Sequence, residues 1–214
     1  MHSRRVLALA LIVWWIIAAG VYAQTDGESN CSADIDYVEI GLDAVFKDDD
    51  ASALQAFDCA VELAPDDPTA LHLRAETAYA LGDVTTALAD YNMLLDINAQ
   101  DTVALLGRAR ALYLEAEIDA ALADYAALLE IDPENAEAHN DRGAIYADLG
   151  DIEAALADYA RALEIDPELV DAYNNRGTLR YVLGEFETAL EDFARALDID
   201  PENALERTNK KFIG

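Results

Sequence analysis

Cysteine and histidine are the side chains best suited to nucleophilic or metal chemistry, and this chain has few of them. Its cysteines are Cys31 and Cys59, and beyond His2 its histidines are His72 and His139. Neither of these two histidines has a serine or cysteine partner at a spacing that suggests a nucleophile and its base. No zinc-type spacing of His and Cys occurs. The sequence therefore predicts no enzyme, no metal site and no cofactor.

Carboxylates are the other reactive groups, and they are too numerous for two of them to be singled out as an acid and a base. The chain has 43 acidic and 14 basic residues, a formal net charge of −29. The run Asp48-Asp49-Asp50 lacks the alternating oxygen ligands and the glycine of a calcium loop, so we interpret it as a solvated turn. A field of this sign repels nucleic acid and anionic lipid, and neither is expected as a partner.

Arginine and aspartate recur together, each at intervals of 34 residues. The series are Arg74, Arg108, Arg142 and Arg176, and Asp90, Asp124, Asp158 and Asp192. One period earlier the same two places hold Ile40 and Ala56, so both partners are replaced together. We predict that each arginine forms a structural ion pair with the aspartate that follows it, and that apolar contact replaces the pair at Ile40 and Ala56. The alternative is two independent surface ladders. A partly buried pair favours orientation more than stability, because desolvation offsets most of the attraction.

The rest of the sequence follows the same period. Residues 139–167 read HNDRGAIYADLGDIEAALADYARALEIDP, and residues 173–201 read YNNRGTLRYVLGEFETALEDFARALDIDP. The landmarks in register are Pro65, Ala99, Pro133, Pro167 and Pro201; small residues at Gly41, Ala75, Ala109, Gly143 and Gly177; alanines at Ala53, Ala87, Ala121, Ala155 and Ala189; and aromatics at Phe57, Tyr91, Tyr125, Tyr159 and Phe193. The small residues are expected where a partner helix backbone comes close, and the aromatics are expected in the core between helices.

These marks resemble the tetratricopeptide repeat, a helix-turn-helix unit of this length. The resemblance implies an all-α fold, a right-handed α-solenoid of five units. The units are residues 34–67, 68–101, 102–135, 136–169 and 170–203, preceded by a segment at 24–33 and followed by a short capping segment at 204–214. One hairpin cannot cover its own apolar face, so the units are expected to stack.

In this family the first helices line a concave groove that takes an extended peptide or a helix of a partner. Carried over to this chain, the candidate partner-binding residues are Phe46, Tyr79, Leu106, Arg110, Tyr113, Asn140, Asn174 and Tyr181. The tyrosines are candidate anchors, with packing between units as the alternative. The lysines with which some members clamp a carboxylate are absent, since no lysine lies between Lys47 and Lys210. A basic or neutral segment with apolar anchors suits the acidic rim.

The N-terminus has the layout of an export signal. Arg4 and Arg5 precede an apolar stretch over residues 6–23, which is expected to be a signal peptide cleaved after Ala23 or else an uncleaved membrane anchor. Membrane contact is expected only through this segment, if it is retained. The rest of the chain would then be periplasmic, extracellular or anchored on the outer face.

An oxidising compartment favours a disulfide between the two cysteines. Cys31 lies just before the first helix of the first unit, and Cys59 lies near the end of the second helix. These places are adjacent in an antiparallel hairpin. The predicted bond would stabilise the first unit by about 3 kcal/mol.

The function that these observations favour is a non-enzymatic scaffold or adaptor for proteins, acting outside the cytoplasm. Two alternatives stay open: a regulatory or positioning subunit of an envelope enzyme complex, and a structural solenoid that assembles with itself. The fold alone cannot choose among them, because function must be argued from a site.

Overall fold

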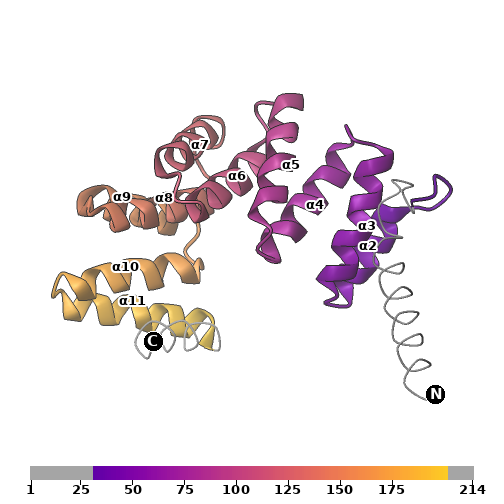
Figure 1. Cartoon of the computed structure of the whole chain (residues 1–214). Helices are drawn as coiled ribbons and strands as arrows, with labels where there is room; N and C mark the ends of the chain where they lie inside the picture. The colour runs from indigo at the N-terminus through magenta and orange to yellow at the C-terminus, as the bar shows by residue number, and fades with distance from the viewer. Residues whose placement is uncertain (1–30, 202–214) are drawn as a thin grey trace, which may run out of the picture. The chain divides into compact units, whose positions relative to one another are not determined.

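The computed structural model describes residues 31–201, and these residues form helices and connecting turns without strands (Figure 1). The helices are α2 (Tyr37–Phe46), α3 (Asp50–Leu63), α4 (Pro68–Ala80), α5 (Val84–Ile97), α6 (Thr102–Leu114), α7 (Ile118–Ile131), α8 (Ala136–Leu149), α9 (Ile152–Ile165), α10 (Val170–Val182) and α11 (Phe186–Ile199). The expected signal or anchor at 1–23 and the expected cap at 204–214 lie outside the described residues.

The chain divides into two compact units, residues 1–35 and 36–214. Of the first, the described part is residues 31–35, where Ile35 N donates a hydrogen bond to the carbonyl oxygen of Ser32 at 3.1 Å. All ten described helices belong to the second.

Five helix pairs make up the described part of the second unit, α2 with α3 through α10 with α11, and each pair packs against the next. The first helices also contact one another directly, α4 with α6, α6 with α8 and α8 with α10. They therefore form a continuous layer over four of the five repeats. This is an α-solenoid of helix-turn-helix repeats, as the sequence predicts (Figure 1).

Acidic side chains at the turns start many of the helices. The carboxylate of Asp101 accepts hydrogen bonds from Val103 N at 3.1 Å and Ala104 N at 3.0 Å at the start of α6. Such caps satisfy backbone donors that the first turn of a helix leaves unpaired. In the acidic turn at residues 48–50, Asp49 caps α3 through Ser52 N at 3.2 Å. That run therefore has a structural use at a helix start.

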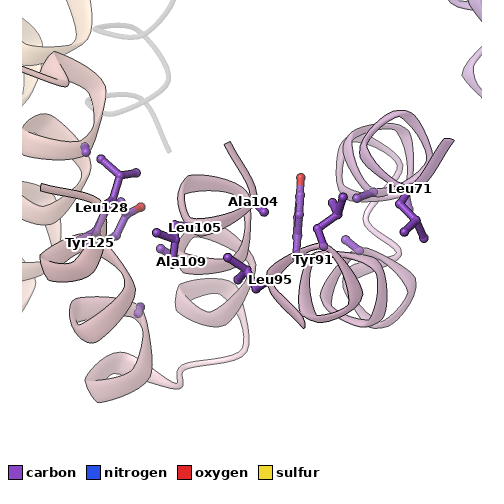
Figure 2. Close-up of a cluster of buried hydrophobic side chains, with 14 of the residues drawn as sticks. Leu71, Tyr91, Leu95, Ala104, Leu105, Ala109, Tyr125 and Leu128 are labelled. Atoms are coloured by element: carbon purple, nitrogen blue, oxygen red, sulfur yellow. The ribbon is translucent and has the colours of Figure 1, made fainter. Parts of the chain in front are cut away.

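The main core runs through α3 to α8 and combines aliphatic side chains with the rings of Tyr91 and Tyr125. Figure 2 shows Tyr91 and Tyr125 within this cluster, together with leucines of neighbouring helices. The aromatic ladder is buried as predicted in four repeats, with exposed fractions of 0% for Phe57, 2% for Tyr91, 1% for Tyr125 and 2% for Tyr159.

The small residues of the first helices leave room for aromatic rings, where the sequence analysis expected a close backbone. A Cβ added at Gly41 would lie 2.2 Å from Cε1 of Phe57, and one added at Gly143 would lie 3.0 Å from Cδ1 of Tyr159. In both cases the ring belongs to the second helix of the same repeat. The small and aromatic series therefore form one packing motif, a ring seated against a residue without a bulky side chain.

Candidate functional site

The four predicted arginine and aspartate pairs are all present, and each is bidentate. In every pair the arginine Nε and Nη2 donate to the two carboxylate oxygens, at distances from 2.6 to 3.0 Å. The pairs are Arg74–Asp90, Arg108–Asp124, Arg142–Asp158 and Arg176–Asp192. The aspartates are 0% to 7% exposed. Hydrogen bonding to the paired aspartate raises the pKa of Arg74, Arg108 and Arg142 above the ordinary value.

The first repeat departs from the expectation of an apolar contact in place of the pair. Ala56 is buried, at 6% exposure, but Ile40 is 49% exposed. A short alanine leaves no side chain that reaches across the hairpin to Ile40, so only one of the two positions is buried.

The arginines of the second and third repeats also reach back to the repeat before them. Arg74 Nη1 donates to Asp58 Oδ1 at 3.2 Å, and Arg108 Nη1 donates to Asn92 Oδ1 at 2.8 Å. Sequence analysis missed these contacts between repeats. The signal was available, because Asp58 and Asn92 are themselves one period apart.

For the arginines of the fourth and fifth repeats, the corresponding places in the preceding repeat hold Ala126 and Ala160. In the fourth and fifth repeats the aspartate gains a second partner from its own repeat. His139 Nδ1 lies 3.1 Å from Asp158 Oδ1, and Arg180 Nη1 lies 2.8 Å from Asp192 Oδ2. His139 thus belongs to the ion-pair network, which sequence analysis had not foreseen.

A second polar network lies on the layer of first helices and is centred on Arg110. Arg110 Nε donates to Asp141 Oδ2 at 2.6 Å, and its Nη2 donates to Glu137 Oε2 at 2.8 Å. These bonds join α6 to α8. Burial disfavours the charge of Arg110, but attraction and hydrogen bonding to the two carboxylates outweigh it and raise the pKa above the ordinary value.

Tyr79 and Tyr91 lie near enough to feel the charge of this arginine, and Tyr113 follows it by three residues on α6. The hydroxyl of Tyr113 donates to the carboxylate of Asp148, again from α6 to α8. That bond, followed by burial, raises the pKa of Tyr113 to about 12. Burial is the main cause that raises the pKa of Tyr91 to about 12, with the charge of Glu76 as the next contribution. Burial also raises the pKa of Tyr79. The phenols therefore stay neutral at physiological pH, and the phenol of Tyr113 is the donor in the hydrogen bond to Asp148.

We call this surface the tyrosine–carboxylate face and define it by Glu76, Tyr79, Arg110, Tyr113, Asp141 and Asp148. It extends over the first helices of three consecutive repeats, α4, α6 and α8.

Sequence models of the tetratricopeptide repeat match most of the described chain. A TPR repeat model matches residues 109–150 and 143–184, and two further tetratricopeptide-repeat models match residues 38–102 and 170–203. The chain belongs to the tetratricopeptide-repeat family. No curated protein is similar enough in sequence to match it.

Solved structures of tetratricopeptide-repeat (TPR) proteins share the fold. A thermophilic TPR protein of Thermus thermophilus, TTC0263, aligns with a TM-score of 0.70 and 23% identity over 83% of this chain and 98% of its own. MamA of Desulfovibrio magneticus aligns with a TM-score of 0.66 and 19% identity over 77% of this chain and 93% of its own. YrrB, described as a TPR protein with an unusual peptide-binding site, aligns with a TM-score of 0.59 and 23% identity over 82% of this chain and 91% of its own.

The TPR arrangement separates the predicted partner-binding residues into accessible and packed ones. Phe46 is 89% exposed and Tyr181 is 46% exposed, the latter in edge-to-face contact with Phe186 at 5.4 Å between ring centroids. Tyr79, Leu106 and Tyr113 are partly buried and pack against the main core. The structure therefore shows a packing role for these three side chains.

The two asparagines have a different environment from the one expected of groove residues. Asn140 is 5% exposed, and its Oδ1 accepts a hydrogen bond from Asn175 Nδ2 at 3.0 Å. It therefore joins the fourth repeat to the fifth. Asn174 is 8% exposed, and its Nδ2 is buried with no hydrogen-bond partner among the described atoms. Because position in a repeat does not reveal the size of the neighbouring side chains, sequence analysis could not foresee this burial.

Glu137, Asp141 and Asn175 were not predicted from the sequence. The available signal was Arg110 itself, which lies two residues after the regular Arg108 and therefore outside the repeated ion-pair series. An arginine on a first helix with acidic residues one repeat later indicates a link between repeats.

Cys31 and Cys59 are both disulfide-bonded in the structure, and the described residues include no free cysteine. Within residues 31–201, no group of three or more His, Cys, Asp or Glu side chains is placed to hold a metal ion. Among the helices of the same residues, none is both long and apolar enough to cross a membrane.

Proposed function

We propose that this TPR protein is a non-enzymatic scaffold or adaptor that acts outside the cytoplasm and binds a segment of a partner protein along its first helices. The observation that carries the proposal is the tyrosine–carboxylate face. It presents neutral phenols and an exposed carboxylate at Glu76, and the partly buried apolar side chain of Leu106 lies in the same layer of first helices. Aromatic side chains with one polar end are frequent at protein interfaces.

The charge of this face favours a basic or neutral partner segment. Its one arginine, Arg110, is already held by Asp141 and Glu137, so it adds little attraction for a carboxylate. Glu76 and Asp148 are exposed carboxylates on either side. Complementary charge mainly sets association rate and specificity, whereas apolar anchors supply most of the affinity.

Action outside the cytoplasm rests on the sequence of residues 1–23 and on the cysteine pair. A disulfide persists in an oxidising compartment and is rare in the cytosol. Both features fit an exported protein.

The face is tested by reversing one charge without disturbing the packing. Glu76→Lys is expected to lower the affinity of a partner captured from the native envelope by about threefold to tenfold, and to weaken the dependence of that affinity on salt. Partners are identified by mass spectrometry and their binding is then measured with purified protein. The matched control is Glu130→Lys, at an exposed glutamate on the second helix α7, which is expected to bind as the wild type does.

Equal binding by the wild type and both variants would place the site elsewhere. Tyrosine-to-alanine variants are less suitable, because Tyr79 and Tyr113 also pack against the core and their loss would weaken the fold itself.

A further inference from the structure

The first helix of the first repeat exposes an apolar strip. Leu42, Val45 and Phe46 are 46%, 41% and 89% exposed on α2. Among the large apolar side chains that the structure describes, Phe46 is the most exposed. Val38 of the same helix and Tyr79 of α4 pack against one shared core, so the strip belongs to the same body as the tyrosine–carboxylate face. Apolar side chains grouped in this way are typical of an interaction site.

Exposed carboxylates lie close to this apolar strip. Glu39 and Asp43 are exposed on α2 itself, and Glu76 is exposed on α4, the first helix of the next repeat. A segment that fits both the strip and these carboxylates carries basic and apolar side chains within a few residues of one another.

One segment of this chain has that composition. Residues 207–214 read RTNKKFIG, with Arg207, Lys210 and Lys211 followed by Phe212 and Ile213. No other lysine occurs after Lys47, and Lys47 is paired with Asp43. In a chain of net charge −29, nowhere else do three basic residues so close together lead directly into two large apolar ones outside the N-terminal signal region.

We infer that residues 207–214 of one copy bind the first helices of a second copy, with Phe212 and Ile213 on the strip formed by Leu42, Val45 and Phe46. Arg207 and the two lysines then lie toward the exposed carboxylate of Glu76 on α4. The spacing allows this: Arg207 and Phe212 are separated by about 17 Å in an extended segment, and packed helices lie about 8–10 Å apart. This inference names an occupant for the proposed binding surface and therefore rests on the proposed function.

The contact joins unlike regions of two copies, since residues 207–214 follow the fifth repeat and the strip lies in the first. Such a heterologous contact leaves one strip and one 207–214 segment unoccupied in every dimer, so assembly can continue beyond two copies. We expect the mass of the purified full chain to rise with concentration.

A complementation experiment tests the inference directly. The variant Lys210→Glu/Lys211→Glu has an impaired 207–214 segment and an intact strip. Phe46→Ser has an impaired strip and an intact 207–214 segment. Each variant alone is expected to be monomeric by light scattering, because in each one either the segment or the strip that it must bind is impaired. An equal mixture of the two is expected to form a heterodimer and no larger species. The matched control Leu190→Ser, at a 67% exposed apolar position on α11, is expected to assemble as the wild type does.

A synthetic peptide RTNKKFIG measures the same contact without assembly. It is expected to bind the full chain about tenfold more weakly after Phe46→Ser, the factor that follows from losing one aromatic contact, and with unchanged affinity after Leu190→Ser. The inference would be overturned if the peptide bound the wild type and Phe46→Ser with equal affinity. It would also be overturned if the mixture of Lys210→Glu/Lys211→Glu with Phe46→Ser stayed monomeric. Binding of the peptide to anionic vesicles but not to the protein would overturn it as well.

Failure here is distinguishable from failure of the proposed function. The Lys210→Glu/Lys211→Glu variant keeps the tyrosine–carboxylate face. If the contact between copies is absent but the proposed function holds, this variant still captures another partner, and that capture is weakened by Glu76→Lys.

Discussion

Replacing Asp158 by alanine is expected to lower the free energy of unfolding by about 3 kcal/mol, the low end of what breaking a buried ion pair costs. Asp158 is 6% exposed and receives two hydrogen bonds from Arg142 and one contact from His139. Its removal leaves the Arg142 guanidinium without its main partner. The cost stays near the low end because the Arg142 side chain, 22% exposed, regains some contact with water.

Urea denaturation followed by circular dichroism measures this effect. Glu153→Ala, on an exposed glutamate of the same helix α9, is the control and is expected to change stability by less than about 0.5 kcal/mol. Adding Arg142→Met to Asp158→Ala is expected to recover part of the loss, because the unpaired charge is then gone. Stability unchanged by Asp158→Ala would show that the repeated pairs contribute nothing to the fold.

Gly107→Ala is expected to destabilise the protein by about 2 kcal/mol, although alanine is the better helix former. In an exposed helix the exchange would gain about 1 kcal/mol. Here a Cβ would lie 2.2 Å from Cζ and 2.5 Å from the hydroxyl oxygen of Tyr91, a ring that is 2% exposed and belongs to the preceding repeat. Overpacking of this kind costs about 1–3 kcal/mol and outweighs the helix propensity where the ring cannot move.

The same denaturation assay decides the sign of the Gly107 effect. Combining Gly107→Ala with Tyr91→Leu is expected to cost less than the sum of the two single changes, because the smaller side chain makes room for the new methyl group. A stability equal to or above that of the wild type for Gly107→Ala alone would mean that Tyr91 shifts at little cost, and that the contact between the second and third repeats tolerates a wider spacing.

The repeated features could be predicted from the sequence because repetition identifies partners without coordinates. Arg142 and Asp158 change together with their counterparts in other repeats, and this co-occurrence was sufficient to pair them. The same logic located the buried aromatic series. It did not reveal that the small residues make room for rings, since a sequence pattern records which residues are small but not what lies against them.

The features that occur once could not be predicted in this way. Arg110 binds Asp141 and Glu137 of the next repeat, and neither partner recurs in register with another arginine of that kind. Asn140 was expected at a binding surface because of its place in the repeat, but it is buried against Asn175 of the next repeat. Which of two positions on a first helix is exposed depends on the size of its neighbours, which is a property of packing.

Photo-crosslinking in the native cell from residue 76, compared with residue 130, tests whether a partner binds the first helices. A photoreactive amino acid at position 76 lies on the tyrosine–carboxylate face, and one at position 130 lies on an exposed second helix. We expect a covalent adduct from position 76 with a partner segment that is basic or neutral and contains apolar residues. An adduct from position 130 and none from position 76 would contradict this expectation, because the partner would then bind the second helices.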